Sequence, residues 1–241
     1  MMDASEPHPV TGEPIGLPVD TTPAQRPSPV TLEGRYGRLE RLAHRHDTAL
    51  WKAVQGHDHI WTYMSYGPLP DFAAFSAWLA GRLKLDDPYS YAIIDRSDQA
   101  LGIATLMEIR PAMRVIEVGN ILYSPALQRT PLGTEAQYLL ARYAFETLGY
   151  RRYEWKCNAL NAASRRAAVR YGFAFEGILR SHMITKERSR DTAYYSLLDS
   201  EWPTRKAAFA RWLAPENFDA QGRQRTSLSE LNGVRALNAA G

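Results

Sequence analysis

The segment at residues 124–136, SPALQRTPLGTEA, holds the residue types with the clearest chemical potential. Thr130 followed by Pro131 is a typical helix start, because threonine caps the first turn and proline fits its first position. That turn presents unpaired backbone N–H groups and the positive end of the helix dipole, which together attract anions, and Gly133 lets a ligand approach the backbone closely. Two side-chain donors stand beside the turn: Gln128 and Arg129. The pattern predicts a phosphate site, although an ordinary capped surface helix has the same local sequence.

Histidine and cysteine offer little support for metal chemistry. The pairs His44-x-His46 and His57-x-His59 could each place two ligands on a strand, but no carboxylate or cysteine is positioned by the sequence to complete either set. We therefore predict no metal site. The single cysteine, Cys157, excludes an intrachain disulfide and is expected to be a buried core thiol.

On both sides of the predicted phosphate loop, segments whose apolar residues repeat every two residues, as in strands, alternate with segments of helical spacing. Three strand-like runs precede it, at residues 89–95, 100–109 and 114–123, and are typical of an antiparallel meander. Helices are expected near Asp47 and over residues 69–85, where Asp71 is the N-terminal signal. After the loop we expect a helix of about 18 residues ending at Gly149, a strand, a second capped helix, a hairpin and a last helix. The strand is expected at residues 151–158 and the second helix at 161–171. The hairpin is expected at 173–185 and 191–199, and the last helix at 204–213. This order predicts an α/β (α+β) fold with a central mixed, largely antiparallel sheet of about seven strands and helices on both faces.

The chain divides into three parts by composition. Residues 1–29 hold seven of the fifteen prolines and almost no periodic apolar pattern, which predicts a disordered or surface-draped arm. Residues 30–213 form the predicted domain. Residues 214–241 are polar apart from four aliphatic residues at three-residue spacing, which predicts a tail with one short helix. Those residues are Leu228, Leu231, Val234 and Leu237.

The overall composition is that of a globular protein. The 241 residues carry 29 basic and 26 acidic side chains, a net charge of +3, and 45% are hydrophobic, which excludes global disorder and collagen-like repeats. Basic residues are interleaved with acidic ones and no base-stacking motif is present, so no nucleic acid partner is expected. No apolar run approaches the roughly 18 residues of a membrane-spanning helix, and the first residues lack signal-peptide features. A cytoplasmic protein without a membrane partner is therefore expected.

Two segments in order, GNILYSPALQRTPLGTEA and RRYEWKCNALNAASRRAAVRYGFAFEG, resemble the acetyl-CoA-binding half of the GNAT acetyltransferase superfamily, and most of all its RimJ/RimL type of ribosomal-protein N-acetyltransferase. The family's loop Gln/Arg-x-x-Gly-x-Gly/Ala is matched by Gln128-x-x-Pro131-x-Gly133. Its later N-x-x-S and G-F-x-x-E-G elements are matched at residues 161–164 and 172–177. The similarity extends from about Leu32 to Asp199.

The resemblance implies acetyl-CoA as co-substrate and a set of residues that bind it. These are Asn120, Ile121, Leu122, Gln128, Arg129, Thr130, Leu132, Gly133, Thr134, Asn161 and Ser164. Pro131 departs from the family pattern, because it stands at the family's first glycine and has no N–H to offer the pyrophosphate. Altered phosphate contacts are therefore expected.

The implied reaction moves an acetyl group to a primary amine within one ternary complex. An amine with a pKa near 10 is protonated at pH 7 and needs a base, and Glu117 matches the family's acidic position. The oxyanion needs a donor, for which the resemblance implies a backbone N–H of residues 119–122 where the strand bulges. Many members protonate the leaving thiolate with a tyrosine, but that position is Ala168 here, so Ser164 is the predicted acid. A strand register shifted by one residue would turn Glu117 to the opposite face.

The acceptor side is less defined. Trp61, Tyr63 and Tyr66 could wall an acceptor pocket, with His182 on the hairpin that borders it, although aromatic residues at this spacing are often core. The acceptor could be a protein N-terminus or a small-molecule amine, and the chain could be a monomer or a homodimer. Because Pro131 and Ala168 depart from the family pattern, one alternative that is not an enzyme stays open: a sensor of the same fold that binds acyl-CoA without turnover.

Overall fold

The structure is a computed structural model that describes residues 5–233. Its centre is a mixed sheet of eight strands in the order β3-β4-β5-β6-β7-β8-β10-β9, in which β7 and β8 are parallel and the other neighbours antiparallel. The strands are β3 (Leu32–Glu33), β4 (Gly37–Arg41), β5 (Tyr89–Asp95), β6 (Ala100–Arg110), β7 (Val115–Tyr123), β8 (Arg152–Asn158), β9 (Ala174–Thr185) and β10 (Arg188–Leu198). The predicted fold class is confirmed. The strand beyond the expected seven arises because a turn at residues 34–36 divides the first apolar segment into β3 and β4.

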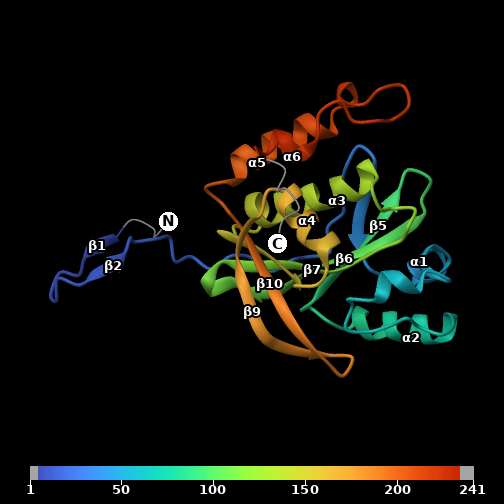
Figure 1. Ribbon diagram of the computed structural model, residues 1–241, viewed down its shortest axis with the longest axis horizontal. Helices are drawn as coiled ribbons and strands as arrows, with labels where there is room; N and C mark the ends of the chain where they lie inside the picture. The colour runs from blue at the N-terminus through green and yellow to red at the C-terminus, as the bar shows by residue number, and fades with distance from the viewer. Residues whose placement is uncertain (1–4, 234–241) are drawn as a thin grey trace.

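Helices cover both faces of the sheet (Figure 1). One face carries α3 (Pro131–Arg142), α4 (Ala162–Arg170), α5 (Trp202–Leu213) and α6 (Leu228–Leu231). The other carries α1 (Asp47–Val54) and α2 (Phe72–Leu83). Two hydrophobic cores result, one beneath α3–α6 and one beneath α1 and α2. We call them the α3-side core and the α1-side core.

The predicted helix caps are present where the sequence places them. The Asp71 side chain accepts from Ala74 N at 2.8 Å at the start of α2, and Thr130 caps α3 with Pro131 as its first residue. The helix expected to run to Gly149 is α-helical only to Arg142 and continues as a π-helical turn over Tyr143–Thr147.

Residues 5–16 form a small hairpin of β1 (Ser5–Pro7) and β2 (Pro14–Gly16) that stands away from the domain (Figure 1). The chain then lies along the domain, where Gln25 N donates to Leu148 O at 2.8 Å and Asp20 pairs with Arg114 at 2.9 Å. At the other end the expected short helix is α6, while Val234 and Leu237 lie outside the described residues.

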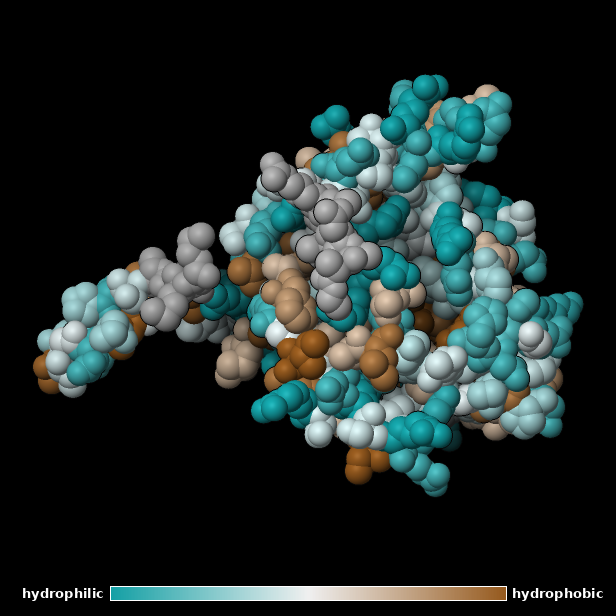
Figure 2. Space-filling model, in the orientation of Figure 1, coloured by the Kyte–Doolittle hydropathy of each residue, from teal (hydrophilic) through white to brown (hydrophobic). Residues whose placement is uncertain are grey.

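The last strand of the sheet, β9, has apolar side chains on its surface. Figure 2 shows brown side chains gathered in this part of the molecule. The exposed apolar residues of β9 are Phe175, Ile178, Leu179, Met183 and Ile184. Within residues 5–233, no helix has both the length and the apolar character needed to cross a bilayer.

Glu135 fastens the turn between β3 and β4 to α3. Its buried carboxylate accepts hydrogen bonds from Arg35 N at 2.6 Å and Tyr36 N at 2.7 Å, and Gly34 lies so close that a Cβ there would come within 2.4 Å of the carboxylate. We expect Glu135→Ala to lower the free energy of unfolding by about 2 kcal/mol, because two N–H groups lose a charged acceptor. Urea unfolding measures this change, with the exposed Glu216→Ala as control. Equal stability of the two variants would contradict this role.

Candidate active site

The parallel pair β7–β8 separates part-way along its length. Pairing runs from Val115 opposite Arg152 to Val118 opposite Trp155, and the structure records no β7–β8 pair beyond this point. Residues 119–123 of β7 continue beside β6 alone, while residues 156–158 of β8 continue beside β10. The centre of the sheet therefore offers two diverging strands with unpaired edges, a position where a ligand can hydrogen-bond to backbone.

A bulge interrupts β7 at this divergence. Gly119 pairs with Thr105 and Leu122 with Ile103, so β7 has one residue more than β6 between these pairs, and Asn120 has a φ of 47°. The extra residue reverses the alternation of the strand: Val118 lies in the α3-side core and Leu122 in the α1-side core. Bulges free backbone groups from the ladder, and this one lies in the segment expected to supply the oxyanion donor.

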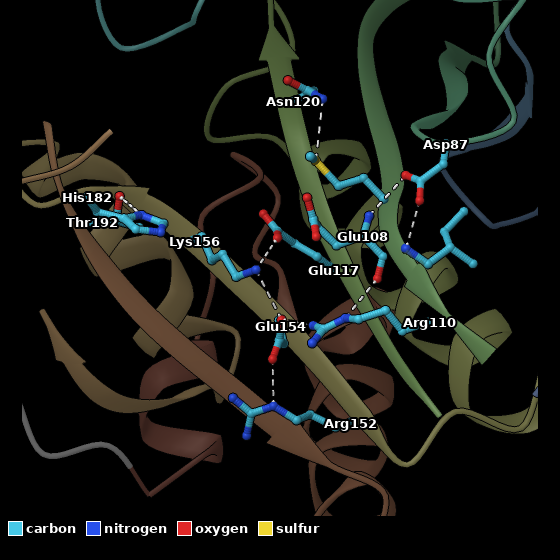
Figure 3. Close-up of polar contacts among 12 residues, drawn as sticks. Asp87, Glu108, Arg110, Glu117, Asn120, Arg152, Glu154, Lys156, His182 and Thr192 are labelled. Atoms are coloured by element: carbon cyan, nitrogen blue, oxygen red, sulfur yellow. Dashed lines mark hydrogen bonds and ion pairs between the residues drawn. The ribbon is translucent and has the colours of Figure 1, made fainter. Parts of the chain in front are cut away.

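The register of β7 determines which way Glu117 faces. Its neighbours Ile116 and Val118 lie in the α3-side core, so Glu117 projects from the opposite face, on the side of α1 and α2. The residue is 5% exposed, and its Oε2 lies 2.9 Å from Lys156 Nζ (Figure 3). Burial raises the pKa of Glu117 to about 7, against the opposing influence of Lys156. A carboxyl with this pKa can accept a proton near neutral pH.

The loop before α3 is built around the cap of that helix. Thr130 Oγ1 accepts from Gly133 N at 3.1 Å and donates to Leu127 O at 2.7 Å. A Cβ on Gly133 would lie 2.8 Å from the same carbonyl oxygen, so only glycine fits this turn without a shift. Within residues 5–233 the backbone N–H groups of Arg129, Thr130 and Leu132 have no hydrogen-bond acceptor. These three donors, together with the helix dipole, fit a pyrophosphate.

The remaining loop residues frame this turn. Gln128 and Arg129 have exposed side chains, and Gln128 Nε2 donates to Tyr123 O at 3.1 Å. Leu132 and Thr134 are buried, and Thr134 Oγ1 accepts from Arg170 Nη1 of α4 at 3.1 Å. Exposed donors therefore lie at the mouth of the loop, while its buried residues join α3 to α4.

Ser164 and Asn161 lie at the start of α4, next to β8. Asn161 Oδ1 accepts from Ser164 N at 3.0 Å, and Ser164 Oγ accepts from Trp155 Nε1 at 3.0 Å. Because the indole only donates, the hydroxyl hydrogen of Ser164 remains available to another acceptor. Ala168, one turn later, is fully buried. The free thiol of Cys157 is buried, and burial raises its pKa.

The predicted acceptor residues occupy different environments. Trp61 is 2% exposed and packs against Tyr66 and Trp78 in the α1-side core. Tyr66 is bonded to both sides of the site, because its hydroxyl accepts from Arg82 Nη2 at 2.8 Å and donates to Asn120 Oδ1 at 3.4 Å. Burial raises the pKa of Tyr66, so it stays protonated.

Two further contacts connect the end of the short 3-10 helix η2 (Asp58–Trp61) and the residues after it with the β9–β10 hairpin and the loop between β8 and α4. Tyr63 is 38% exposed and donates to Leu160 O at 3.2 Å, while Lys186 Nζ at the tip of the β9–β10 hairpin donates to Trp61 O at 2.8 Å. His182 is exposed on β9, with Nδ1 3.0 Å from Thr192 Oγ1. This segment is thus fixed to the hairpin, to the β8–α4 loop and, through Tyr66, to β7.

Comparison with known families agrees with this geometry. Residues 38–174 match the family model described as acetyltransferase (GNAT) domain. The chain belongs to the GNAT acetyltransferase family. The family part of the predicted resemblance is thereby confirmed. No curated protein sequence matches this GNAT chain.

Solved GNAT structures share the fold over most of the chain. A GCN5-related N-acetyltransferase from Brucella melitensis is 47% identical, with a TM-score of 0.86 over 88% of this chain and 98% of that one. A probable GNAT acetyltransferase from Chromobacterium violaceum is 41% identical, with a TM-score of 0.74 over 81% and 100% of the two chains. A spermidine N-acetyltransferase from Vibrio cholerae, solved with CoA and spermine, is 18% identical with a TM-score of 0.57 over 68% and 96%, and shows a common fold alone.

Three groups of the predicted site residues lie along β7 and β8. Glu117 and Asn120 lie on β7, Ser164 lies against β8, and the cap of α3 follows β7 in the chain. The sequence analysis missed Lys156 and Glu154, which share the Glu117 face. Their alternation with the core residues Tyr153 and Trp155 was a signal for that face, but the sequence could not show that β7 lies next to β8 there.

Proposed function

We propose that this GNAT protein is an acetyl-CoA-dependent N-acetyltransferase that moves an acetyl group to a primary amine by direct attack in a ternary complex. One observation carries the proposal: Glu117, a buried carboxyl with a pKa of about 7, lies on β7 two residues before the Gly119–Leu122 bulge. A base with this pKa is half ionised at neutral pH and can take the proton of an attacking amine.

The residues present fit acetyl-CoA. The three unpartnered N–H groups before α3 and in its first turn would bind the pyrophosphate, Asn161 the pantetheine, and the bulge region of β7 the acetyl end. Pro131 offers no N–H, and the neighbouring donors remain for this purpose. The co-substrate supplies an acetyl group activated as a thioester.

Residues of this chain would act as the base, the oxyanion donor and the acid of the reaction. Glu117 removes a proton from the ammonium group, and the freed amine attacks the thioester carbonyl to form the new C–N bond. A backbone N–H of residues 119–122 donates to the oxyanion until the C–S bond breaks. Ser164 donates its hydroxyl proton to the departing sulfur, and the second proton lost by the attacking nitrogen replaces it on the serine. The products are the amide and the CoA thiol, and the proton held by Glu117 passes to solvent. The acceptor class proposed is a primary amine, on a peptide N-terminus as in the RimJ/RimL branch or on a small molecule.

Thiol release from acetyl-CoA across N-terminal peptides, polyamines and free amino acids tests the function. Acceptor-dependent release would support it and name the acceptor class. Saturable CoA binding without thiol release across the panel would favour the sensor alternative. The observation that supports this alternative is the buried Ala168 at the position where many family members have a tyrosine.

Ser164→Ala tests the proposed acid. We expect kcat to fall about tenfold rather than more, because a thiol with a pKa near 8.5 leaves readily without full protonation. The KM for acetyl-CoA should change little. Ser200→Ala, in an exposed turn, is the control. Unchanged kcat in Ser164→Ala would assign this serine to the Trp155 hydrogen bond alone.

A further inference from the structure

Lys156 contacts the proposed base through a defined arrangement of strands. On β8 it follows Glu154 by two residues, so both project from the face opposite Trp155, which lies in the α3-side core. Parallel pairing sets Glu117 directly beside Glu154. The Nζ of Lys156 consequently reaches both carboxylates, at 2.9 Å from Glu117 Oε2 and 3.2 Å from Glu154 Oε2 (Figure 3).

Glu154 does not depend on Lys156 for its charge partner. Arg110 Nη2 lies 2.6 Å from its Oε2 and Arg152 Nε lies 2.7 Å from its Oε1. Two guanidinium groups therefore already balance this carboxylate. For Glu117, by contrast, Lys156 is the one cation within ion-pair distance in residues 5–233.

The lysine side chain is itself held from the other side. Tyr194 of β10 pairs directly with Lys156, and Lys156 Nζ lies 4.9 Å from the centre of the tyrosine ring. The side chain of Lys156 is only 15% exposed. A lysine enclosed by two carboxylates and an aromatic ring has little freedom to leave Glu117, unlike a surface lysine whose ion pair water would weaken.

We propose that Lys156 is a positioning residue that fixes the carboxylate of Glu117 on the α1 and α2 side of the sheet and favours its ionised form for the incoming amine. The inference rests on the proposed function, because it assigns Lys156 a role only through Glu117.

The charges around Glu117 give the direction of the effect. Lys156 and Glu154 face it from β8 and Glu108 from β6; the two carboxylates and burial raise the pKa of Glu117, and Lys156 lowers it. Burial would lower the pKa of Lys156, but Glu117 and Glu154 outweigh it and raise that pKa, so the ammonium persists. Removing the ammonium should move the pKa of Glu117 above its value of about 7, so that less of the base is ionised at neutral pH.

The first test compares pH profiles of kcat/KM for wild type and Lys156→Met on one acceptor. We expect the acidic limb of the variant to move upward by about one pH unit or more, which means a loss of about fivefold at pH 7 that is regained above about pH 9. Lys156→Arg should restore much of the profile. The control is Lys206→Met, which should leave the profile unchanged. It removes a lysine of α5 whose Nζ lies 2.8 Å from Glu146 Oε1.

A second measurement does not need an acceptor. Carbon-13 NMR of protein labelled at the glutamate carboxyl follows the titration of Glu117, whose signal is assigned by its disappearance in Glu117→Gln. A higher pKa of Glu117 in Lys156→Met than in wild type supports the proposal, and equal values overturn it, whether or not acetyl transfer is detected. If the pKa of Glu117 rises in Lys156→Met while Glu117→Gln retains full activity, Lys156 does act on Glu117, but Glu117 is not the catalytic base.

Discussion

Replacing Glu117 by glutamine is expected to lower kcat for acetyl transfer by about 10²- to 10⁴-fold, the range typical of a lost general base. The amide has nearly the same shape but cannot take the ammonium proton, so the acceptor remains protonated. Binding of acetyl-CoA should persist, because the residues proposed for it lie in other segments of the site. Steady-state kinetics and calorimetric titration with CoA measure the two quantities separately.

Glu146→Gln is the matched control for this experiment. Glu146 also pairs with a lysine, Lys206, and accepts from Trp202 Nε1 at 2.8 Å, but it lies outside the proposed site. Thermal unfolding of both variants separates a folding defect from a catalytic one. Retained kcat in a folded Glu117→Gln would show that another group accepts the proton.

Gly133→Val should raise the KM for acetyl-CoA by about 30- to 100-fold, the equivalent of losing one or two charge-assisted hydrogen bonds. The first carbon of the new side chain would lie 2.8 Å from Leu127 O and 3.2 Å from Tyr123 Cε2. The loop must therefore move, and the N–H groups of Arg129 and Thr130 move with it. At saturating acetyl-CoA, kcat should stay within about threefold of wild type.

Gly81→Val provides the control for this substitution. A Cβ at Gly81, on α2, has no heavy atom within 4 Å, so the same added side chain meets open space. Calorimetry with CoA gives the affinity directly. An unchanged affinity in Gly133→Val would argue against pyrophosphate binding at the start of α3.

Features that depend on neighbouring residues could be predicted from the sequence. The caps of α2 and α3 and the meander β5–β6–β7 follow from short-range rules, because a cap needs only its own turn and a meander only its connecting turns. The GNAT family was also accessible, because its two motifs are contiguous stretches in a fixed order.

Only the tertiary structure showed which side chains come into contact when strands distant in the sequence lie side by side. The face of Glu117 follows from the register of β7, and the contact with Lys156 exists because β7 and β8 are adjacent although 28 residues separate Tyr123 from Arg152. Burial likewise assigned Trp61 to the α1-side core. The sequence by itself thus determined the family and the helix caps. The partner and the ionisation of the proposed base depend instead on distances between strands and on exclusion of water, which arise only when the chain is packed.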